Sequence, residues 1–170
     1  KNINNYKFSK NVSILTNQIN NSDYNFLKKE LSIKLKKFEI IRINNIPEPN
    51  LLPWYCLDFM KQNYKNKSFS HFLYLEDDIL ITENNINYWV FARKILKKFN
   101  FIPAFLRCEN NGKKLFSVDN PKTIKINSTP KILTKSEKFG FINLKYPYHA
   151  SCLMDRDLMK EYIKSKVVGI

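Results

Sequence analysis

The segment FLYLEDDIL, residues 72–80, places three consecutive carboxylates directly behind an apolar run. The run at residues 71–76 predicts a buried β-strand, so Glu76, Asp77 and Asp78 should lie at its carboxyl end. In an open parallel sheet, ligands bind beyond the carboxyl ends of the strands. Three neighbouring carboxylates repel one another unless a cation offsets their charge. The segment therefore predicts a strand that ends in a cation-binding acidic site.

The same three acids could instead have a structural role. Acids between a strand and a helix often cap the helix. The next predicted helix begins near residues 82–85, and the apolar residues 79–81 separate it from the acids. This spacing is longer than the usual capping distance. The sequence therefore favours Mg²⁺ or Mn²⁺ as the partner of the acids, together with a diphosphate. A capping or solvated role stays open.

The surrounding pattern predicts an α/β fold. Up to about residue 100 the chain alternates predicted strands (11–17, 39–43, 71–76) and helices (23–38, 54–64, 84–99), which indicates a parallel sheet covered on both faces. The remainder is more antiparallel, with a hairpin around Asn111-Gly112 in 103–119, a strand pair at 123–127 and 131–134, an extended segment at 141–155 and a helix at 155–166. We expect one compact domain, residues 1–170, with a nucleotide-binding lobe of about 1–100 and an acceptor-side lobe of about 101–170.

Composition limits the partners of the chain. Its formal net charge of +14 suits nucleic acid, a membrane surface or an anionic substrate, although scattered lysines are also typical of solvated faces. The three cysteines form no CxxC pair, which argues against a zinc cluster and a disulfide framework and favours a reducing compartment. We therefore expect a cytoplasmic protein and leave open a peripheral contact with an anionic membrane. No run of apolar residues is long enough to predict a membrane span.

The residues around the acids resemble a known family. The sequence FLYLEDDILIT…NNINYW is similar to the acidic (DXD) motif of GT-A fold glycosyltransferases, which has an EDD form in the N-acetylglucosaminyltransferase I family. The spacing to LPWYCLDFM, IPAFLRCEN and YPYHASCLMDRDLMKEYI also resembles bacterial-type nucleotide-sugar glycosyltransferases. The resemblance implies a mixed GT-A (Rossmann-like) sheet. It also implies metal-dependent transfer of a sugar from a nucleoside diphosphate-sugar to an acceptor hydroxyl on a glycan, polysaccharide or glycolipid.

The same resemblance implies roles for individual residues. Asp78 would bind Mn²⁺ or Mg²⁺, while Asp77 and Glu76 would contact the ribose of the donor or the waters of the metal. Topology alone places Thr16 and Asn17, at the end of the first strand, near the nucleoside.

Further candidates lie on the acceptor side. Arg107 and Glu109 could bridge the metal site or hold an acceptor hydroxyl, although a solvent-facing pair is equally consistent with the sequence. His149 could complete the metal site or contact a sugar, and a structural histidine is the alternative. Trp54 could stack on a sugar or a base, or belong to the core.

The start of the final helix offers two candidate catalytic bases, Asp155 and Asp157. Either could take the proton of an acceptor hydroxyl, and helix capping is the alternative role for both. Since GT-A enzymes often carry a base or a metal-binding histidine further along, we expect the chain to be truncated at its C-terminus.

Two other functions compete with glycosyl transfer. A nucleotidyltransferase also uses carboxylates and a metal, but it usually has a glycine-rich, basic phosphate loop after its first strand. The corresponding segment, ILTNQINNSD at 14–23, has no glycine, lysine or arginine. A non-catalytic nucleic-acid-binding domain would suit the net charge, but no recognised motif is present and the acidic triplet would obstruct a basic groove. The sequence favours the glycosyltransferase and no nucleic-acid partner.

Overall fold

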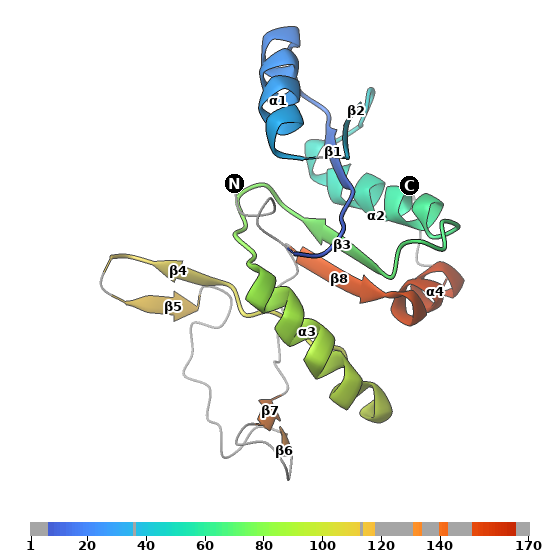
Figure 1. Ribbon diagram of the computed structural model, residues 1–170, viewed down its shortest axis with the longest axis vertical. Coiled ribbons are helices and arrows are strands. Elements are labelled where there is room, and N and C mark those ends of the chain that lie inside the picture. The colour runs from blue at the N-terminus through green and yellow to red at the C-terminus, as the bar shows by residue number, and fades with distance from the viewer. Residues whose placement is uncertain are drawn as a thin grey trace. The chain divides into compact units, whose positions relative to one another are not determined.

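The computed structural model describes residues 7–35, 37–112, 114–117, 131–133, 140–142 and 151–165 (Figure 1). The chain divides into two compact units, Lys1–Tyr88 together with Ala150–Ile170, and Trp89–His149. The sequence predicted two consecutive lobes with a boundary near residue 100. The C-terminal strand and helix instead belong to the first unit, because that strand pairs with one from the N-terminal half.

The mixed α/β content is confirmed. The elements are β1 (Val12–Thr16), α1 (Asn21–Lys34), β2 (Phe38–Arg42), α2 (Leu52–Asn63), β3 (His71–Leu75), α3 (Glu83–Leu96), β4 (Cys108–Asn110), β5 (Leu115–Ser117), β6 (Lys131–Leu133), β7 (Gly140–Ile142), β8 (Ser151–Asp155) and α4 (Arg156–Lys164), with 3₁₀ turns at Pro49–Leu51 and Lys97–Phe99. The first helix ends before its predicted end at residue 38, because the backbone is already extended at Leu35.

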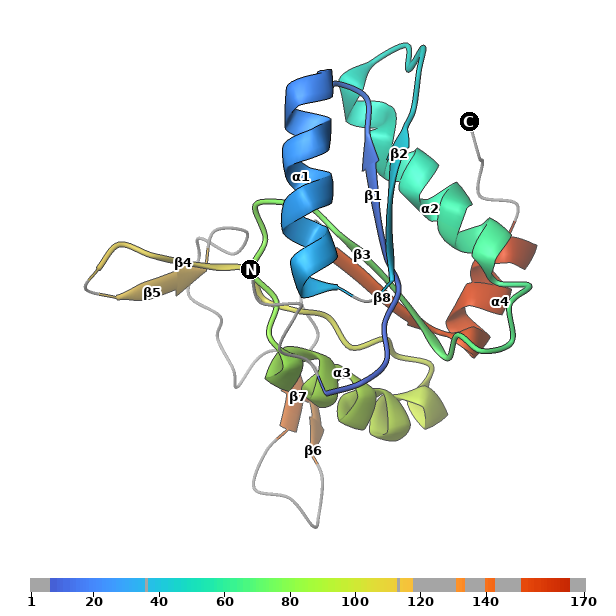
Figure 2. The same cartoon turned by 45° about the horizontal axis from the view of Figure 1, so that its top comes forward.

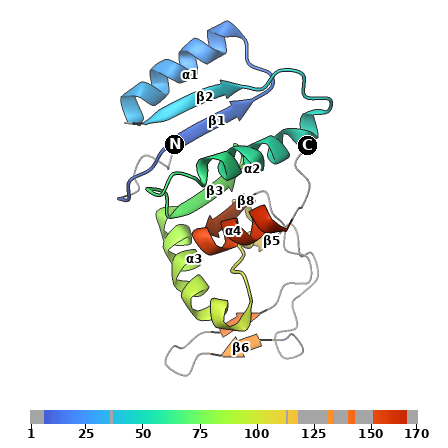
Figure 3. The same ribbon diagram turned by 90° about the vertical axis from the view of Figure 1, so that its right-hand side faces the viewer.

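The first unit contains the parallel pair that the alternating pattern predicts. β1 and β2 run parallel, with Val12 opposite Phe38 and Thr16 opposite Arg42. α2 contacts β1 as well as β3, so one helix covers both strands. In Figure 3 the arrows of β1, β2 and β3 point the same general way. The carboxyl ends of the paired strands β1 and β2 therefore lie at the same end of their sheet.

β3 has an antiparallel neighbour that the sequence did not predict. It pairs with β8, with His71 opposite Asp155 and Leu75 opposite Ser151. The pair contributes buried residues on both strands, and α4 adds two more to this core (Phe72, Leu153, Met154, Leu158 and Met159). The strands that the structure describes form four two-stranded sheets, so they do not confirm the predicted mixed GT-A (Rossmann-like) sheet.

The second unit is organised around Trp89. This side chain is 1% exposed, and its indole N–H donates to the carbonyl oxygen of Pro103 at 3.0 Å. β4 and β5 form the predicted hairpin (Figure 2), and Gly112 has a φ of 84° in its turn, a conformation that glycine adopts without a steric penalty. β6 pairs with β7, whereas the predicted strand at 123–127 lies outside the described residues.

The four α-helices that the structure describes are all too short or too polar to cross a bilayer.

Candidate functional site

The three carboxylates follow β3 in a tight turn. The backbone N–H of Ile79 donates to the carbonyl oxygen of Glu76 at 3.2 Å, which closes the turn around Asp77 and Asp78. Both aspartates are exposed, whereas Glu76 is half-buried. Ile81, which follows the turn, is buried and fixes the chain to the core. The turn therefore presents two aspartates to solvent from an anchored backbone.

A neighbouring tyrosine holds the first of the three acids. The hydroxyl of Tyr74 donates to Oε1 of Glu76 at 3.0 Å. The two residues are two positions apart, a spacing that places side chains on the same face of an extended chain. Sequence reasoning missed Tyr74, although this spacing was visible in YLE. The hydrogen bond orients Glu76 and leaves its second carboxylate oxygen available to another donor.

The acids do not cap the following helix. Thr82 occupies the cap of α3, and its Oγ1 accepts a hydrogen bond from the backbone N–H of Asn85 at 3.3 Å. The side-chain oxygen of Asn85 accepts in return from the backbone N–H of Thr82 at 2.9 Å. This reciprocal pair satisfies the helix end in the manner of a capping box. The capping alternative for Glu76, Asp77 and Asp78 is therefore wrong at α3.

The chemistry of the turn fits a hard divalent cation. Among the described residues, no three His, Cys, Asp or Glu side chains converge as a ready-made metal cage. Mg²⁺ commonly needs less than that, because one or two carboxylates suffice when phosphate oxygens and waters complete the shell. Asp77 and Asp78 supply exposed carboxylates of this kind. Asp77 and Asp78 are therefore the described residues of this turn that could contribute carboxylates to such a shell.

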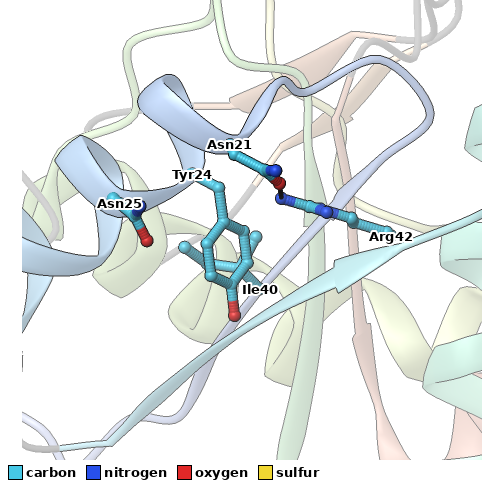
Figure 4. Close-up of a pocket in the computed structure, with 5 residues that line it drawn as sticks. All are labelled: Asn21, Tyr24, Asn25, Ile40 and Arg42. Atoms are coloured by element: carbon cyan, nitrogen blue, oxygen red, sulfur yellow. Dashed lines mark hydrogen bonds between the residues drawn. The ribbon is translucent and has the colours of Figure 1, made fainter.

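A shallow pocket lies at the carboxyl end of β2 (Figure 4). It has a volume of about 570 Å³ and is lined by Asn21, Tyr24 and Asn25 from α1 and by Ile40 and Arg42 from β2. The guanidinium of Arg42 donates from Nη2 to Oδ1 of Asn21 at 3.0 Å and lies 4.6 Å from the centre of the Tyr24 ring. The pocket thus combines an aromatic face with a fixed cation and two amides.

The predicted nucleoside-side residues lie beside this pocket. Thr16 is directly opposite Arg42 in the parallel pair, and its carbonyl oxygen accepts from the backbone N–H of Ile43 at 2.8 Å. Asn17 follows Thr16 and is half-buried. The sequence predicted Thr16 and Asn17 near the nucleoside from topology alone, and it did not single out Tyr24 or Arg42. The signal for Arg42 was a lone cation at the end of the apolar strand EIIR.

The acceptor-side candidates are distributed over both units. Trp54 is 39% exposed in the first turn of α2, which belongs to the first unit. Arg107 is half-buried just before β4, and Glu109 is exposed within β4, opposite Phe116 in the hairpin of the second unit. His149 lies outside the described residues.

The two candidate bases do not join the acidic turn. Oδ1 of Asp155 accepts from the backbone N–H of Leu158 at 2.8 Å, so this residue caps α4. Asp155 is also opposite His71, the first residue of β3, while the acids follow the last residue, Leu75. These two ends of the strand are about 13 Å apart at the usual rise per residue. Asp157 is exposed in the first turn of α4. The prediction that either aspartate acts beside Asp78 is therefore corrected.

Cys56 and Cys152 are half-buried and suit apolar packing better than a role as nucleophiles. Burial raises the pKa of Cys56 to about 11, and it also raises the pKa of Cys152, which lies opposite Tyr74. A thiol with a raised pKa carries little thiolate near neutral pH and reacts slowly.

Comparison of the chain with protein-family models, with curated proteins and with solved structures gave no match. The interpretation of the site therefore depends on its own residues.

Proposed function

We propose that this chain is a metal-dependent glycosyltransferase of the GT-A type, which moves a sugar from a nucleoside diphosphate-sugar to an acceptor hydroxyl. One observation carries the proposal: Asp77 and Asp78 are exposed in an anchored turn at the carboxyl end of a strand. The hydrogen bond from Tyr74 to Glu76 supports it, because a carboxylate held in one orientation is suited to ligand binding.

The first unit offers a place for the nucleoside as well. Thr16 ends β1 opposite Arg42, Asn17 follows it, and Arg42 lines the pocket. The Tyr24 ring offers a face for stacking, and the guanidinium of Arg42 attracts anionic groups. We assign the nucleoside to this edge, with Trp54 as a further ring at the start of α2.

The carboxylates carry the chemistry in this proposal. Asp78, assisted by Asp77, would hold Mn²⁺ or Mg²⁺, which when bound would neutralise the diphosphate and make it a better leaving group. Glu76 would accept a hydrogen bond from the ribose. The acceptor oxygen would form the new bond to the anomeric carbon as the bond to the diphosphate oxygen breaks, and the nucleoside diphosphate would depart with that electron pair.

The acceptor hydroxyl must lose its proton in this step. Asp155 and Asp157 lie at the wrong end of β3 to accept this proton, so in this proposal it passes to solvent water. We place the reaction in the cytoplasm, with a glycan or a lipid-linked acceptor.

A thermal-shift experiment tests the proposal. The melting temperature of the full chain is measured with Mn²⁺ alone, with each of several nucleoside diphosphates alone, and with both together. We expect a rise only with the pair, since a ligand that binds only the folded state at a hundred times its Kd stabilises by about 2.7 kcal/mol. Asp78→Asn should lose this rise.

Glu161→Gln is the matched control, because it removes one exposed carboxylate from α4, away from the turn. This variant should respond like the parent chain. The proposal fails if no nucleoside diphosphate shifts the parent chain with Mn²⁺, or if the Asp78 and Glu161 variants respond alike.

A further inference from the structure

A second surface, which does not involve the acidic turn, lies where α3 ends. The residues Lys97–Ile102, with the sequence KKFNFI, are all exposed, and we refer to them as the 97–102 tip. Phe99 and Phe101 are each 46% exposed, and Ile102 is 59% exposed. Large apolar side chains at this level of exposure, adjacent in the chain, indicate a binding surface.

Buried contacts hold the tip in this form. Nη1 of Arg93 donates to the carbonyl oxygen of Phe101 at 3.3 Å. The indole N–H of Trp89 donates to the carbonyl oxygen of Pro103 at 3.0 Å. Both donors are buried on α3. Asn100 turns the chain with a φ of 57°, a left-handed conformation that asparagine tolerates better than other side chains with a Cβ. The rings are thus exposed by a fixed backbone.

The sequence on either side of the tip carries charges of one sign. Residues 84–108 contain no aspartate or glutamate, but they contain five cations (Arg93, Lys94, Lys97, Lys98 and Arg107). Phe91, Lys94 and Lys98 follow one another at helical spacing and are exposed, so they extend the surface along α3. The ammonium of Lys98 lies 5.0 Å from the centre of the Phe99 ring. Aromatic and cationic groups therefore alternate on the same surface.

We propose that the 97–102 tip docks on an anionic lipid bilayer. Phe99, Phe101 and Ile102 enter the boundary between headgroups and acyl chains, as apolar faces of interfacial segments do. The lysines stay in the headgroup layer and bind lipid phosphates, since their long stems let the ammonium reach water.

Other partners fit the tip less well. A single-stranded nucleic acid would use the rings for stacking, but Ile102, the most exposed of the three apolar side chains, has no π face. A second copy of the chain would bring two strongly positive surfaces together.

Vesicle flotation with the full chain tests this proposal. The vesicles contain phosphatidylcholine with phosphatidylserine at a ratio of about three to one, or phosphatidylcholine alone. We expect the chain to float only with the anionic vesicles, and less at higher salt. K97E/K98E should weaken binding by at least about thirtyfold, since each lysine near an anionic surface contributes about 1 kcal/mol. F99S/F101S should weaken it by about tenfold or more.

Matched pairs on α1 provide the controls. K28E/K29E changes the net charge by the same amount at exposed lysines, and F26S/I33S removes two exposed apolar side chains. Both should float like the parent chain, and circular dichroism should show that all four variants are folded. Absence of flotation with anionic vesicles overturns the proposal. Equal losses in the tip and α1 variants also overturn it, as does tip-dependent binding of single-stranded DNA without vesicle binding.

Discussion

Carboxylates lie near both ends of β3, but their hydrogen bonding differs. At the carboxyl end, Asp77 and Asp78 are exposed, and neither has a hydrogen-bond or ion-pair partner within the described part of the chain. At the amino end, Asp155 of the neighbouring strand accepts a backbone N–H and caps α4. The first pair of acids performs no structural task that the structure describes, whereas the other acid terminates a helix.

The difference separates a candidate binding site from a structural one. A carboxylate that satisfies a helix N-terminus stabilises the fold, because the backbone N–H groups there lack partners within the helix. An exposed carboxylate in a turn contributes little to the stability of the fold and is accessible to a ligand. Substitutions at the amino end should therefore lower stability, and substitutions at the carboxyl end should change ligand binding.

The largest stability effect at the amino end should come from Arg156→Met. The guanidinium of Arg156 donates to the backbone oxygens of Asn66, Phe69 and Tyr64 at 3.1, 2.8 and 2.8 Å. It also lies 4.3 Å from the centre of the Tyr64 ring. A cation in the first turn of α4 is otherwise unfavourable, so these contacts explain its position. We expect a loss of about 3 kcal/mol in the free energy of unfolding, measured by urea denaturation.

Arg156→Lys is the control for this prediction. Lysine keeps the charge but lacks the planar fork that reaches three oxygens, so its free energy of unfolding should lie between those of the parent and the methionine variant. An unchanged stability in Arg156→Met would show that the carbonyl oxygens find water equally well.

A paired substitution compares the two ends directly. Asp155→Ala removes the cap of α4 and should lower the free energy of unfolding by about 1 kcal/mol, whereas Asp78→Ala should change it by less than about 0.5 kcal/mol. The rise in melting temperature with Mn²⁺ and a nucleoside diphosphate should be lost in Asp78→Ala and kept in Asp155→Ala. Asp155→Asn should restore most of the stability, since asparagine also caps helices. Equal losses of stability in the two alanine variants would contradict the distinction.

Sequence reasoning succeeded where the signal was local. The apolar run before the acids predicted β3, and Asn111-Gly112 predicted the hairpin, because a turn needs particular residues at particular positions. The distance to the next helix argued against a capping role for the acids, and Thr82 caps α3 instead. The prediction that Phe38 belongs to the first helix was wrong, because Phe38 begins β2. A single apolar residue at the boundary of two elements fits the repeat of a helix as well as that of a strand.

The partner of β3 could not be predicted in the same way. β8 lies far along the chain, and an apolar strand does not encode which edge it joins or in which direction. That pairing decides that Asp155 lies at the opposite end of β3 from Asp78. The contact between Arg42 and Tyr24 depends in the same way on how α1 lies against β2. Residues of the candidate site were thus recognisable as types, but their grouping required the tertiary structure.

The smallest expected effect concerns His71, which faces Asp155 at the amino end of β3. Partial burial lowers the pKa of His71 below its ordinary 6.5, and the charge of Asp155 opposes this shift. The unfolded chain therefore binds a proton more readily than the folded chain. Stability should be highest above about pH 6.5 and should fall as the pH drops through that value toward the lower folded pKa.

His71→Gln should remove this part of the pH dependence, so the fall in melting temperature between about pH 8 and pH 5 should become smaller. The effect should be modest, because the burial of His71 is only partial and the charge of Asp155 opposes it. His149→Gln is the matched control, since it removes the other histidine of the chain. If the dependence of melting temperature on pH changes in the His149 variant and not in the His71 variant, His71 does not contribute to the pH dependence of stability.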